Sequence, residues 1–321
     1  MEQRRLRLLL FFGGCIFALF SAFVLLSSEE AQRREALLSE DAQYRPVPFS
    51  ERETVSEYPD TESVPAPVDE YFKPGEGMLA SVAAKLSGSE ENVPEGPYVA
   101  IVIDDFGFSR IMAEEYEKLN MPVTWAIIPF QRFSSFAAER ANESGIPYIV
   151  HLPMGAREDP RWTGSRPVDR VDSGMSREDI SLFLRGIMES LPDAVGLNNH
   201  RGSRATSDEQ LMDSFMEILG DYPLFFLDSR TSSSSVAYRT AVEKGIPALY
   251  NSVFLDHEPT EEFMEAQFRR GTAIAEKRGW VVMIAHTKNT TLNFLRKRIE
   301  APLERGTLVT LPDLVRFLHM R

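Results

Sequence analysis

Short apolar runs alternate with amphipathic stretches along the chain after Pro97, and this alternation predicts repeated β-α units. Each run has four to eight residues, the usual length of a buried strand. The expected strands are Tyr98–Ile103, Val123–Ile128, Tyr148–Leu152, Ala194–Leu197, Leu224–Leu227, Ala248–Leu255, Trp280–Ile284 and Thr307–Thr310. Because helical patterns separate them, the runs are typical of a mainly parallel sheet with helices packed on it.

Helical periodicity fills the intervals between the expected strands. In one interval, apolar residues recur at helical spacing from Leu211 to Leu219; Ser207 or Asp208 is expected to cap its start and Gly220 to end it. The other expected helices are Ile111–Leu119, Phe136–Ser144, Ile180–Leu191, Val236–Lys244 and Phe263–Lys277. Seven or eight such units within residues 97–321 predict an α/β fold consisting of a single β/α barrel.

The first 26 residues are predicted to be a membrane anchor. Arg4, Arg5 and Arg7 precede an uncharged apolar run of 19 residues, Leu8–Leu26. At 1.5 Å per residue, such a run crosses a hydrocarbon core of ~30 Å. The positive flank is expected to stay in the cytoplasm, so the rest of the chain would be exported. A cleaved signal peptide and a buried helix are the alternatives, but no A-x-A-like cleavage site follows the run.

Residues 27–96 are predicted to form an acidic, proline-containing, disordered tether. They hold 16 acidic and 6 basic residues, and therefore −10 of the net charge of −13. Seven prolines interrupt the stretch and apolar residues are sparse, so it cannot bury enough surface to offset its ordering entropy. The boundaries expected are therefore 1–26 for the anchor, 27–96 for the tether and 97–321 for one folded domain.

Composition narrows the chemistry that this domain can carry. The chain has one cysteine, Cys15, which excludes a disulfide framework and cysteine-based zinc sites. The acidic balance argues against a nucleic-acid partner, which would need a basic face. A metal site must therefore be built from His, Asp and Glu.

Unusual polar residues follow the expected strands at the points where they end. They are Asp104-Asp105, His151, Asn198 to Arg204, Asp228 to Thr231, Asp256-His257 and His286-Thr287. Four of the five histidines occupy such positions. In β/α barrels the chemistry lies at this end of the strands, so the clustering indicates a functional site.

Each of these residues also has an ordinary structural interpretation. Paired aspartates after a strand often form a turn and a helix cap, and a lone histidine there is often a satisfied core residue. His257 is expected in a surface loop, and His319, in the last helix, needs no role. The sequence contains no G-x-S-x-G elbow, Walker loop or dinucleotide-binding fingerprint.

Considered together, the polar residues predict metal-assisted amide hydrolysis. Asp105, His151 and His200 would supply one carboxylate and two imidazoles to a metal, as catalytic Zn²⁺ sites do. Asp104 is then the candidate general base and His286 the candidate general acid. Asp228 or Arg204 is expected to orient these groups.

The same stretches resemble the polysaccharide deacetylase superfamily, and specifically its divergent branch, the YibQ-like envelope proteins. The matching segments are Ala100–Gly107, Val150–Met154, Gly196–Arg204, Phe225–Ser232 and Ala248–Asp256. The resemblance implies an incomplete, seven-stranded barrel that removes acetyl groups from glycans with a divalent metal, usually Zn²⁺. It implies the base at Asp104, a metal ligand at Asp105 and the acid at His286. Asn199 and Arg230 lie in matching segments and are candidates for supporting these groups or contacting substrate.

The sequence departs from the superfamily pattern at three places. The chain has no His-x-x-x-His pair, so His151 and His200 replace it by position and chemistry alone. Arg201 to Arg204 stand roughly where an Arg-x-Pro-Tyr segment is expected. The late motif is Ala285-His286-Thr287, where the branch suggests Gly-His-Pro.

The leading hypothesis is a metal-dependent carbohydrate deacetylase that acts on an envelope glycan. It would be anchored in the bacterial inner membrane, with its domain on the periplasmic side. The main alternative is a catalytically silent barrel that binds a glycan or an envelope protein as a scaffold. A glycoside hydrolase with paired carboxylates is a third possibility, but it would leave the histidines without a role.

Overall fold

The computed structural model describes residues 81–82, 84–86, 94–164, 168–299, 303 and 305–319. All of them belong to the compact unit Arg52–Arg321. The expected anchor and most of the expected tether lie outside the described residues. Within the described part of the chain, no helix is long and apolar enough to cross a membrane.

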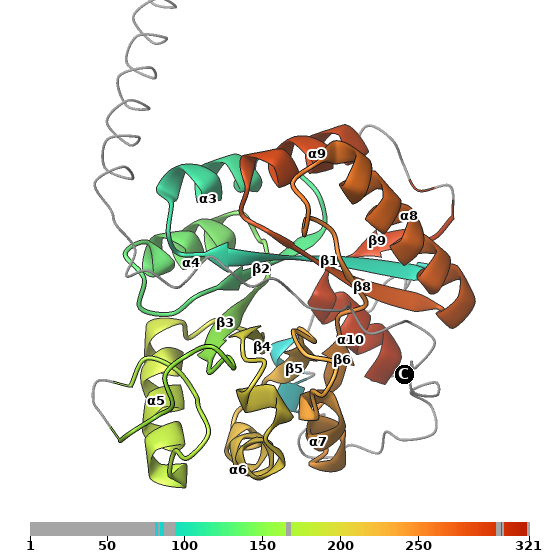
Figure 1. Ribbon diagram of the computed structural model, residues 1–321. Helices are drawn as coiled ribbons and strands as arrows, with labels where there is room; N and C mark the ends of the chain where they lie inside the picture. Colours follow the sequence, from blue (N-terminus) through green and yellow to red (C-terminus); the bar gives the residue numbers. More distant parts are fainter. Residues whose placement is uncertain are drawn as a thin grey trace, which may run out of the picture. The chain divides into compact units, whose positions relative to one another are not determined.

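The described chain forms one sheet with helices around it (Figure 1). The strands are β1 (Tyr98–Phe106), β2 (Val123–Ile127), β3 (Tyr148–Met154), β4 (Gly196–Arg201), β5 (Phe225–Asp228), β6 (Ala248–Tyr250), β7 (Val253–Phe254), β8 (Trp280–His286) and β9 (Thr307–Val309). The helices are α3 (Arg110–Glu117), α4 (Ser134–Glu143), α5 (Arg177–Ser190), α6 (Glu209–Leu219), α7 (Ala237–Glu243), α8 (Glu261–Arg278), α9 (Asn289–Ile299) and α10 (Leu311–His319), with a short 3₁₀ turn at Ala205–Ser207. These elements confirm the predicted β-α alternation. Asp208, the second of the two expected caps, accepts a hydrogen bond from the Leu211 amide at the start of α6.

The sheet is parallel and curls into an incomplete barrel. Its strand order is β6-β5-β4-β3-β2-β1-β8-β7, and β9 pairs with the first residues of β1. The two strands at the ends of this order, β6 and β7, are separated in the chain by only Asn251 and Ser252. The edges of the sheet therefore meet at one corner of the chain, without a hydrogen-bonded ladder between β6 and β7.

The single strand expected over Ala248–Leu255 is wrong, because the run changes partner at this corner. The amide of Asn251 donates to Asp228 O of β5 (2.9 Å), whereas the amide of Ser252 donates to Val282 O of β8 (3.0 Å). The side chain of Asn251 accepts from the Val253 amide (3.1 Å) and stabilises the turn between them. With β6 and β7 counted as one interrupted strand, seven strands surround the barrel and β9 lies beside β1.

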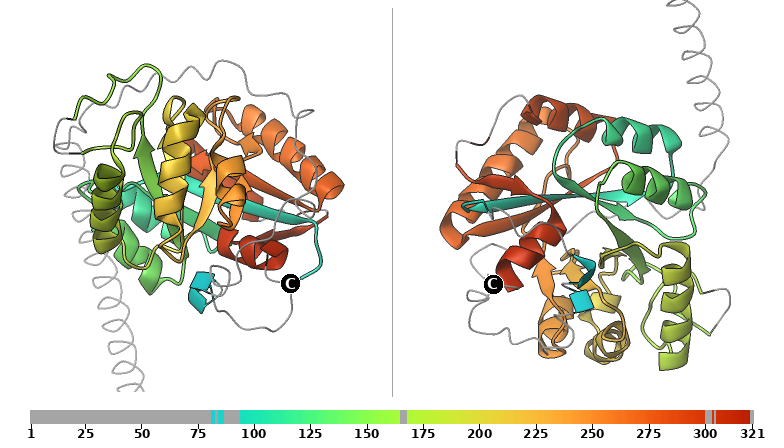
Figure 2. Two further views of the ribbon diagram at one scale, coloured as in Figure 1. Left: turned by 90° about the horizontal axis from the view of Figure 1, so that it is seen from below. Right: turned by 180° about the vertical axis from the view of Figure 1, so that it is seen from behind.

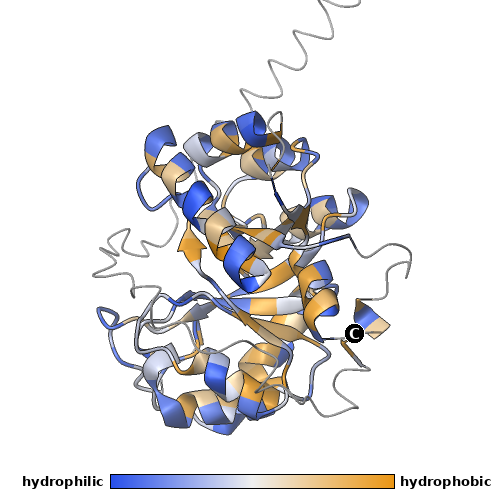
Figure 3. Ribbon diagram, turned by 90° about the vertical axis from the view of Figure 1, so that its right-hand side faces the viewer, coloured by the Kyte–Doolittle hydropathy of each residue, from blue (hydrophilic) through white to orange (hydrophobic). Residues whose placement is uncertain are grey.

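Period-two alternation divides the apolar side chains into two cores. On β1, Val99, Ile101 and Ile103 belong to the outer core, between the sheet and the surrounding helices. Ala100 and Val102 belong to the inner core, inside the curl of the sheet. The strands are accordingly hydrophobic on both faces, while the helices expose hydrophilic residues (Figure 3).

Helix α10 closes the end of the barrel at which the strands begin. Leu314 and Val315 are fully buried in the inner core, and the Tyr98 ring lies 5.1 Å from that of Phe317. The amide of Leu311 donates to Thr124 Oγ1 of β2 (2.9 Å). Figure 2 shows this red helix apart from the helices that surround the sheet. With the starting end closed, the opposite end of the strands is left for a site.

Packed structure begins earlier than the predicted boundary at Pro97. Val82 is fully buried, Leu86 packs against the inner core, and Lys85 Nζ donates to Pro192 O (3.4 Å). Val82, Lys85 and Leu86 therefore contact the domain, although the sequence placed them in the tether.

Gly155, just after β3, lies in the tightly packed loops at the end of the barrel where the strands finish. A Cβ at this position would lie 2.1 Å from Asp172 Oδ1. Asp172 is fully buried and paired with Arg204 through two contacts of 3.0 and 2.6 Å, so it cannot move without breaking a buried ion pair. We expect Gly155→Ala to lower the free energy of unfolding by ~2 kcal/mol or more, measured by urea denaturation. Gly186→Ala in α5, where a Cβ has ordinary contact distance, is the control and should be neutral or stabilising.

Candidate metal centre

A β-bulge at the end of β1 places two adjacent carboxylates on the same side of the sheet. Ile103 pairs with Trp125 of β2, but Phe106 pairs with Ile127, so β1 has one residue more than β2 across this interval. Asp104 continues the inward series of Ala100 and Val102. Asp105 would follow Ile103 outward, but its left-handed backbone (φ 71°) turns its side chain toward the barrel. Bulges of this kind commonly re-aim a side chain beside an active site.

The end of β8 clamps this bulge. The amide of Thr287 donates to Asp104 O (3.1 Å), and its hydroxyl donates to Asp105 O (3.1 Å). Both carbonyls of the bulge are thereby hydrogen-bonded to one residue. A proline at this position, as the late motif suggested, could provide neither donor.

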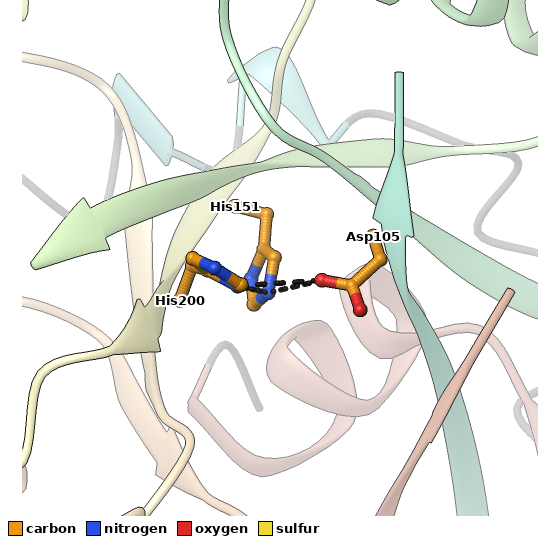
Figure 4. A group of neighbouring side chains, drawn as sticks. All are labelled: Asp105, His151 and His200. Atoms are coloured by element: carbon orange, nitrogen blue, oxygen red, sulfur yellow. Dashed lines mark hydrogen bonds and ion pairs between the residues drawn. The ribbon is translucent and has the colours of Figure 1, made fainter. Parts of the chain in front are cut away.

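Asp105, His151 and His200 converge at this end of the barrel from β1, β3 and β4 (Figure 4). Asp105 Oδ1 lies 3.3 Å from His151 Nε2 and 3.3 Å from His200 Nδ1, and the two nitrogens are 3.0 Å apart. The predicted ligand set is therefore brought together, with one ligand atom from each residue within 4.8 Å of the others.

These three residues fit a divalent metal ion. Asp105 Oδ1 is buried and has no hydrogen-bond donor among the described residues, although two imidazole nitrogens lie beside it. Metal–ligand bonds of ~2.0–2.2 Å in a tetrahedron imply ligand separations of ~3.3–3.6 Å, close to the distances of 3.3, 3.3 and 3.0 Å observed. Two imidazoles and one carboxylate are also a donor set that suits Zn²⁺ and other first-row metals.

Asn198 sets the orientation of His151. Its Oδ1 lies 2.8 Å from His151 Nδ1, and its Nδ2 donates to Asp104 Oδ1 (3.0 Å) and Ser229 Oγ (3.2 Å). Because the amide oxygen can only accept, Nδ1 of His151 carries a proton, and Nε2 is the nitrogen available to a metal. Asn198 was not among the predicted site residues.

The candidate base, Asp104, is almost wholly buried beside the three candidate metal ligands. Its Oδ2 lies 3.6 Å from His151 Nε2, and only 3% of the side chain is exposed. Burial raises the pKa of Asp104 to about 6, against the opposing charges of His151 and His286. Burial would also raise the pKa of Asp105, but the imidazoles of His151 and His200 hold it well below its usual range.

The candidate acid, His286, stands opposite Asp104 on β8 and is held by a carboxylate of its own. Asp104 and His286 are paired in the β1–β8 register. Asp256 Oδ1 lies 2.8 Å from His286 Nδ1, and Asp256 Oδ2 accepts from the His286 amide (2.9 Å) and from Thr291 Oγ1 (2.6 Å). Burial opposes the imidazolium, but Asp256 outweighs it and raises the pKa of His286 to about 9.

The remaining predicted residues lie in the loops around the centre. Arg204 pairs with the buried Asp172, and Asp228 accepts hydrogen bonds from Ser235 Oγ and from the amides of Arg230 and Tyr238. Both carboxylate–donor networks stabilise loops after β4 and β5. Asp228 or Arg204 was expected to orient the candidate catalytic groups. At His286 the contacts that hold the side chain come from Asp256 instead.

Asn199 lies on β4, and Arg230 follows the end of β5. The Asn199 carboxamide bridges the ends of β4 and β5, through Arg201 O (2.6 Å) and the Ser229 amide (2.9 Å). The guanidinium of Arg230 lies over the Tyr250 ring, 4.7 Å from its centroid.

Alternation along the strands is the signal that identifies the missed residues. Leu197 and Leu255 belong to the outer core, so Asn198 and Asp256, the next residues, face inward. Phe226 also belongs to the outer core, and Asp228, two residues later, continues on that side. Counting inward positions would have selected Asn198 and Asp256 over Asp228.

The molecule is therefore an α/β protein whose curled parallel sheet carries a candidate His/Asp metal site at the ends of its strands. The chain belongs to the divergent polysaccharide deacetylase family, whose model matches residues 101–315. It is 32% identical over 205 residues to the protein YibQ of Escherichia coli K12, a match that covers 63% of this chain and 62% of that one. The chain thus spans less than two thirds of that relative.

Two further matches agree with this assignment. A Haemophilus influenzae protein is 32% identical over 227 residues, which cover 68% of this chain and 76% of that one. A crystal structure of a protein from Agrobacterium tumefaciens C58 superposes with a TM-score of 0.63 at 20% identity, over 76% of this chain and 99% of that one. The match to the Agrobacterium tumefaciens structure supports the assignment of the fold alone.

Thr287→Val tests whether the clamp on the bulge sets metal affinity. Valine keeps the amide donor but loses the hydroxyl that binds Asp105 O. Because supporting residues of this kind change metal affinity by about 10–100-fold, we expect the affinity for added Zn²⁺, used as the probe metal, to fall by at least about tenfold in a chelator competition. Thr287→Ser retains the hydroxyl and should bind like the wild type. Equal affinity of the valine variant would show that the amide alone holds the bulge.

Asp256→Asn tests the electrostatic origin of the raised His286 pKa. Removing the charge of Asp256 leaves only Asp104 and Asp105 to oppose the effect of burial, so the pKa of His286 should fall from about 9 toward its ordinary range. Histidine side-chain NMR titration of metal-free protein measures this. Thr291→Val is the control, because it removes a donor to Asp256 but keeps the negative charge, so His286 should stay protonated to high pH. An unchanged titration in Asp256→Asn would assign the shift to Asp104 and Asp105 instead.

Proposed function

We propose that this protein is a metal-dependent carbohydrate deacetylase that uses Zn²⁺. The observation that carries the proposal is the convergence of Asp105, His151 and His200, with Asp104 and His286 paired across β1 and β8 beside them. Three protein ligands that leave positions open are typical of catalytic rather than structural zinc. A scaffold would not need an acid and a base beside such a centre.

A divalent ion bound by these ligands would activate water and polarise the acetyl carbonyl. Asp104, with its pKa of about 6, is ionised near neutrality and can accept a proton from the attacking water. His286, with its pKa of about 9, is protonated there and can donate to the departing nitrogen or oxygen of the sugar. Water and the acetylated sugar are consumed, and acetate and the free sugar are released.

The exposure of the side chains is suited to a polymeric substrate. Asp104 and His151 are each 3% exposed, whereas Asp105, His200 and His286 are 29, 17 and 27% exposed. Asp104 and His151 therefore lie at the bottom of the site. His286 is more exposed to solvent, so a leaving sugar beside it could remain in solvent.

We further propose that the substrate is an envelope glycan and that the domain lies on the periplasmic side of the bacterial inner membrane. Support comes from the sequence, in which a basic flank precedes the apolar run Leu8–Leu26. The scaffold hypothesis remains the second candidate. It is favoured by the missing His-x-x-x-His pair, which His151 and His200 replace from different strands.

Metal content and acetate release from one set of proteins test the proposal. We expect the full-length chain, purified in detergent, to hold close to one Zn²⁺ by mass spectrometry, and His151→Ala and His200→Ala to lose it. His257→Ala, an exposed histidine outside the centre, is the matched control and should retain the metal. Asp104→Asn should keep the metal and lose acetate release from acetylated glycan oligomers.

The outcomes separate the candidate functions. Metal that is bound without acetate release from any acetylated glycan would favour the scaffold. Absence of metal uptake by the wild type would contradict the proposed centre. Glycan chain cleavage that survives a chelator would favour a glycoside hydrolase with paired carboxylates.

A further inference from the structure

The corner where the sheet edges meet carries two arginines around one tyrosine ring. The guanidinium carbons of Arg230 and Arg278 lie 4.7 and 5.0 Å from the centroid of the Tyr250 ring. Arg230 follows β5, Tyr250 ends β6, and Arg278 ends α8. Two positive charges are therefore gathered at the one place where the barrel has no hydrogen-bonded ladder.

Arg278 is satisfied by neutral groups only. It donates from Nε to Trp280 O (3.0 Å), from Nη1 to Tyr250 Oη (2.7 Å) and from Nη2 to Ser252 Oγ (2.9 Å). Its guanidinium carbon also lies 3.8 Å from the centroid of the Trp280 ring. Burial lowers the pKa of Arg278, which expresses the cost of holding this cation away from water.

Arg230 is held in place by its backbone rather than by an ion pair. It adopts a left-handed conformation (φ 52°), and its amide donates to Asp228 Oδ1 (2.8 Å). The carboxylate of Asp228 is near enough to feel the charge of Arg230, but its oxygens accept from Ser235, the Tyr238 amide and this amide. Within the described part of the chain, no carboxylate forms an ion pair with either guanidinium.

The charge of the corner contrasts with the rest of the protein. The chain is acidic, at −13 overall, and its other arginines in this region pair with carboxylates, as Arg239 does with Glu209. A partly buried cation without a counter-ion is unfavourable, and a backbone held in the left-handed region costs further free energy. Such a combination is typical of a site whose missing partner is a ligand.

We propose that Arg230 and Arg278 form an oxyanion site at this corner, which takes a phosphate or carboxylate group. Arg guanidinium groups bind such groups with paired N–H donors, and Arg278 has N–H groups beyond the three already engaged. The Tyr238 ring packs against Tyr250, and burial raises the pKa of Tyr238 to about 12, so its hydroxyl stays protonated as a further donor.

Two residues, Ser229 and Asn198, connect the Arg230 side of this site to the metal centre. Ser229, which precedes Arg230, accepts a hydrogen bond from Asn198, the residue that orients His151. Resting on the proposed deacetylase function, this placement indicates a glycan substrate that bears carboxylate or phosphate groups. A free anion that stabilises the corner is the other source of the same chemistry.

Phosphate binding by metal-free protein tests the site without any turnover. We expect inorganic phosphate, compared with chloride at equal ionic strength, to raise the melting temperature of the chelator-treated full-length chain in a saturable manner. Arg230→Gln should weaken this binding by about tenfold or more, the loss of one charge-assisted contact. Arg239→Gln, an exposed arginine of α7, should bind phosphate like the wild type.

A second variant protects the test against misfolding. Arg278→Lys keeps the buried charge but loses the planar donors, so it should fold and still bind phosphate weakly. The site would be overturned if phosphate did not stabilise the wild type in a saturable manner. It would also be overturned if Arg230→Gln and Arg278→Lys were stabilised as much as the wild type, and the arginines would then only hold the corner together.

Kinetics with acetylated oligomers then distinguish the two sources of the anion. For a glycan-borne group, Arg230→Gln should raise KM for acidic oligomers and leave neutral ones unchanged. Equal KM values for both would assign the site to a free anion. Failure of the deacetylase proposal would abolish turnover on every oligomer but leave phosphate binding intact.

Discussion

The centre depends on placing two consecutive aspartates of one strand on the same side of a sheet. Regular β geometry forbids this, because neighbouring side chains point to opposite faces. The bulge at Asp104-Asp105 solves the problem with a left-handed residue, and Thr287, which directly follows the neighbouring strand β8, donates hydrogen bonds to both of its carbonyls. The distortion is supported from β8, the strand that also carries His286, so the acid and the bulge are fixed by the same pairing.

Burying those carboxylates requires compensation, and the neighbouring strands supply it. Asn198 donates to Asp104 with one end of its amide and accepts from His151 with the other. One neutral side chain thus stabilises the ionised base and selects the tautomer that leaves a lone pair for a metal. An uncompensated carboxylate at 3% exposure would instead be driven toward its protonated form.

The sequence predicted the fold and the candidate ligand set because both follow from local pattern. Apolar runs marked the strands, and polar residues at their ends marked His151, His200 and His286. Alternation, had it been counted, also selects Asn198 and Asp256. The break at Asn251 and the bulge at Asp105 were beyond such reasoning, because each arises from a change of hydrogen-bonding partner between distant strands. Arg204 and Asp172 likewise meet only through long loops.

Different carboxylates contact the candidate metal ligands and the candidate acid. Asp104 and Asp105 lie beside His151, whereas Asp256 contacts His286. Asp104 and Asp105 raise the pKa of His151 against its burial, so protonation of His151 would compete with metal binding. A metal bound at this centre would require His151 in its neutral form, so its affinity should fall as the pH is lowered. His286 would lose its proton to the same positive charge if it relied on Asp104 and Asp105 alone. Because Asp256 contacts it on the far nitrogen, with Thr291 fixing that carboxylate, the acid can remain charged while the cation is bound.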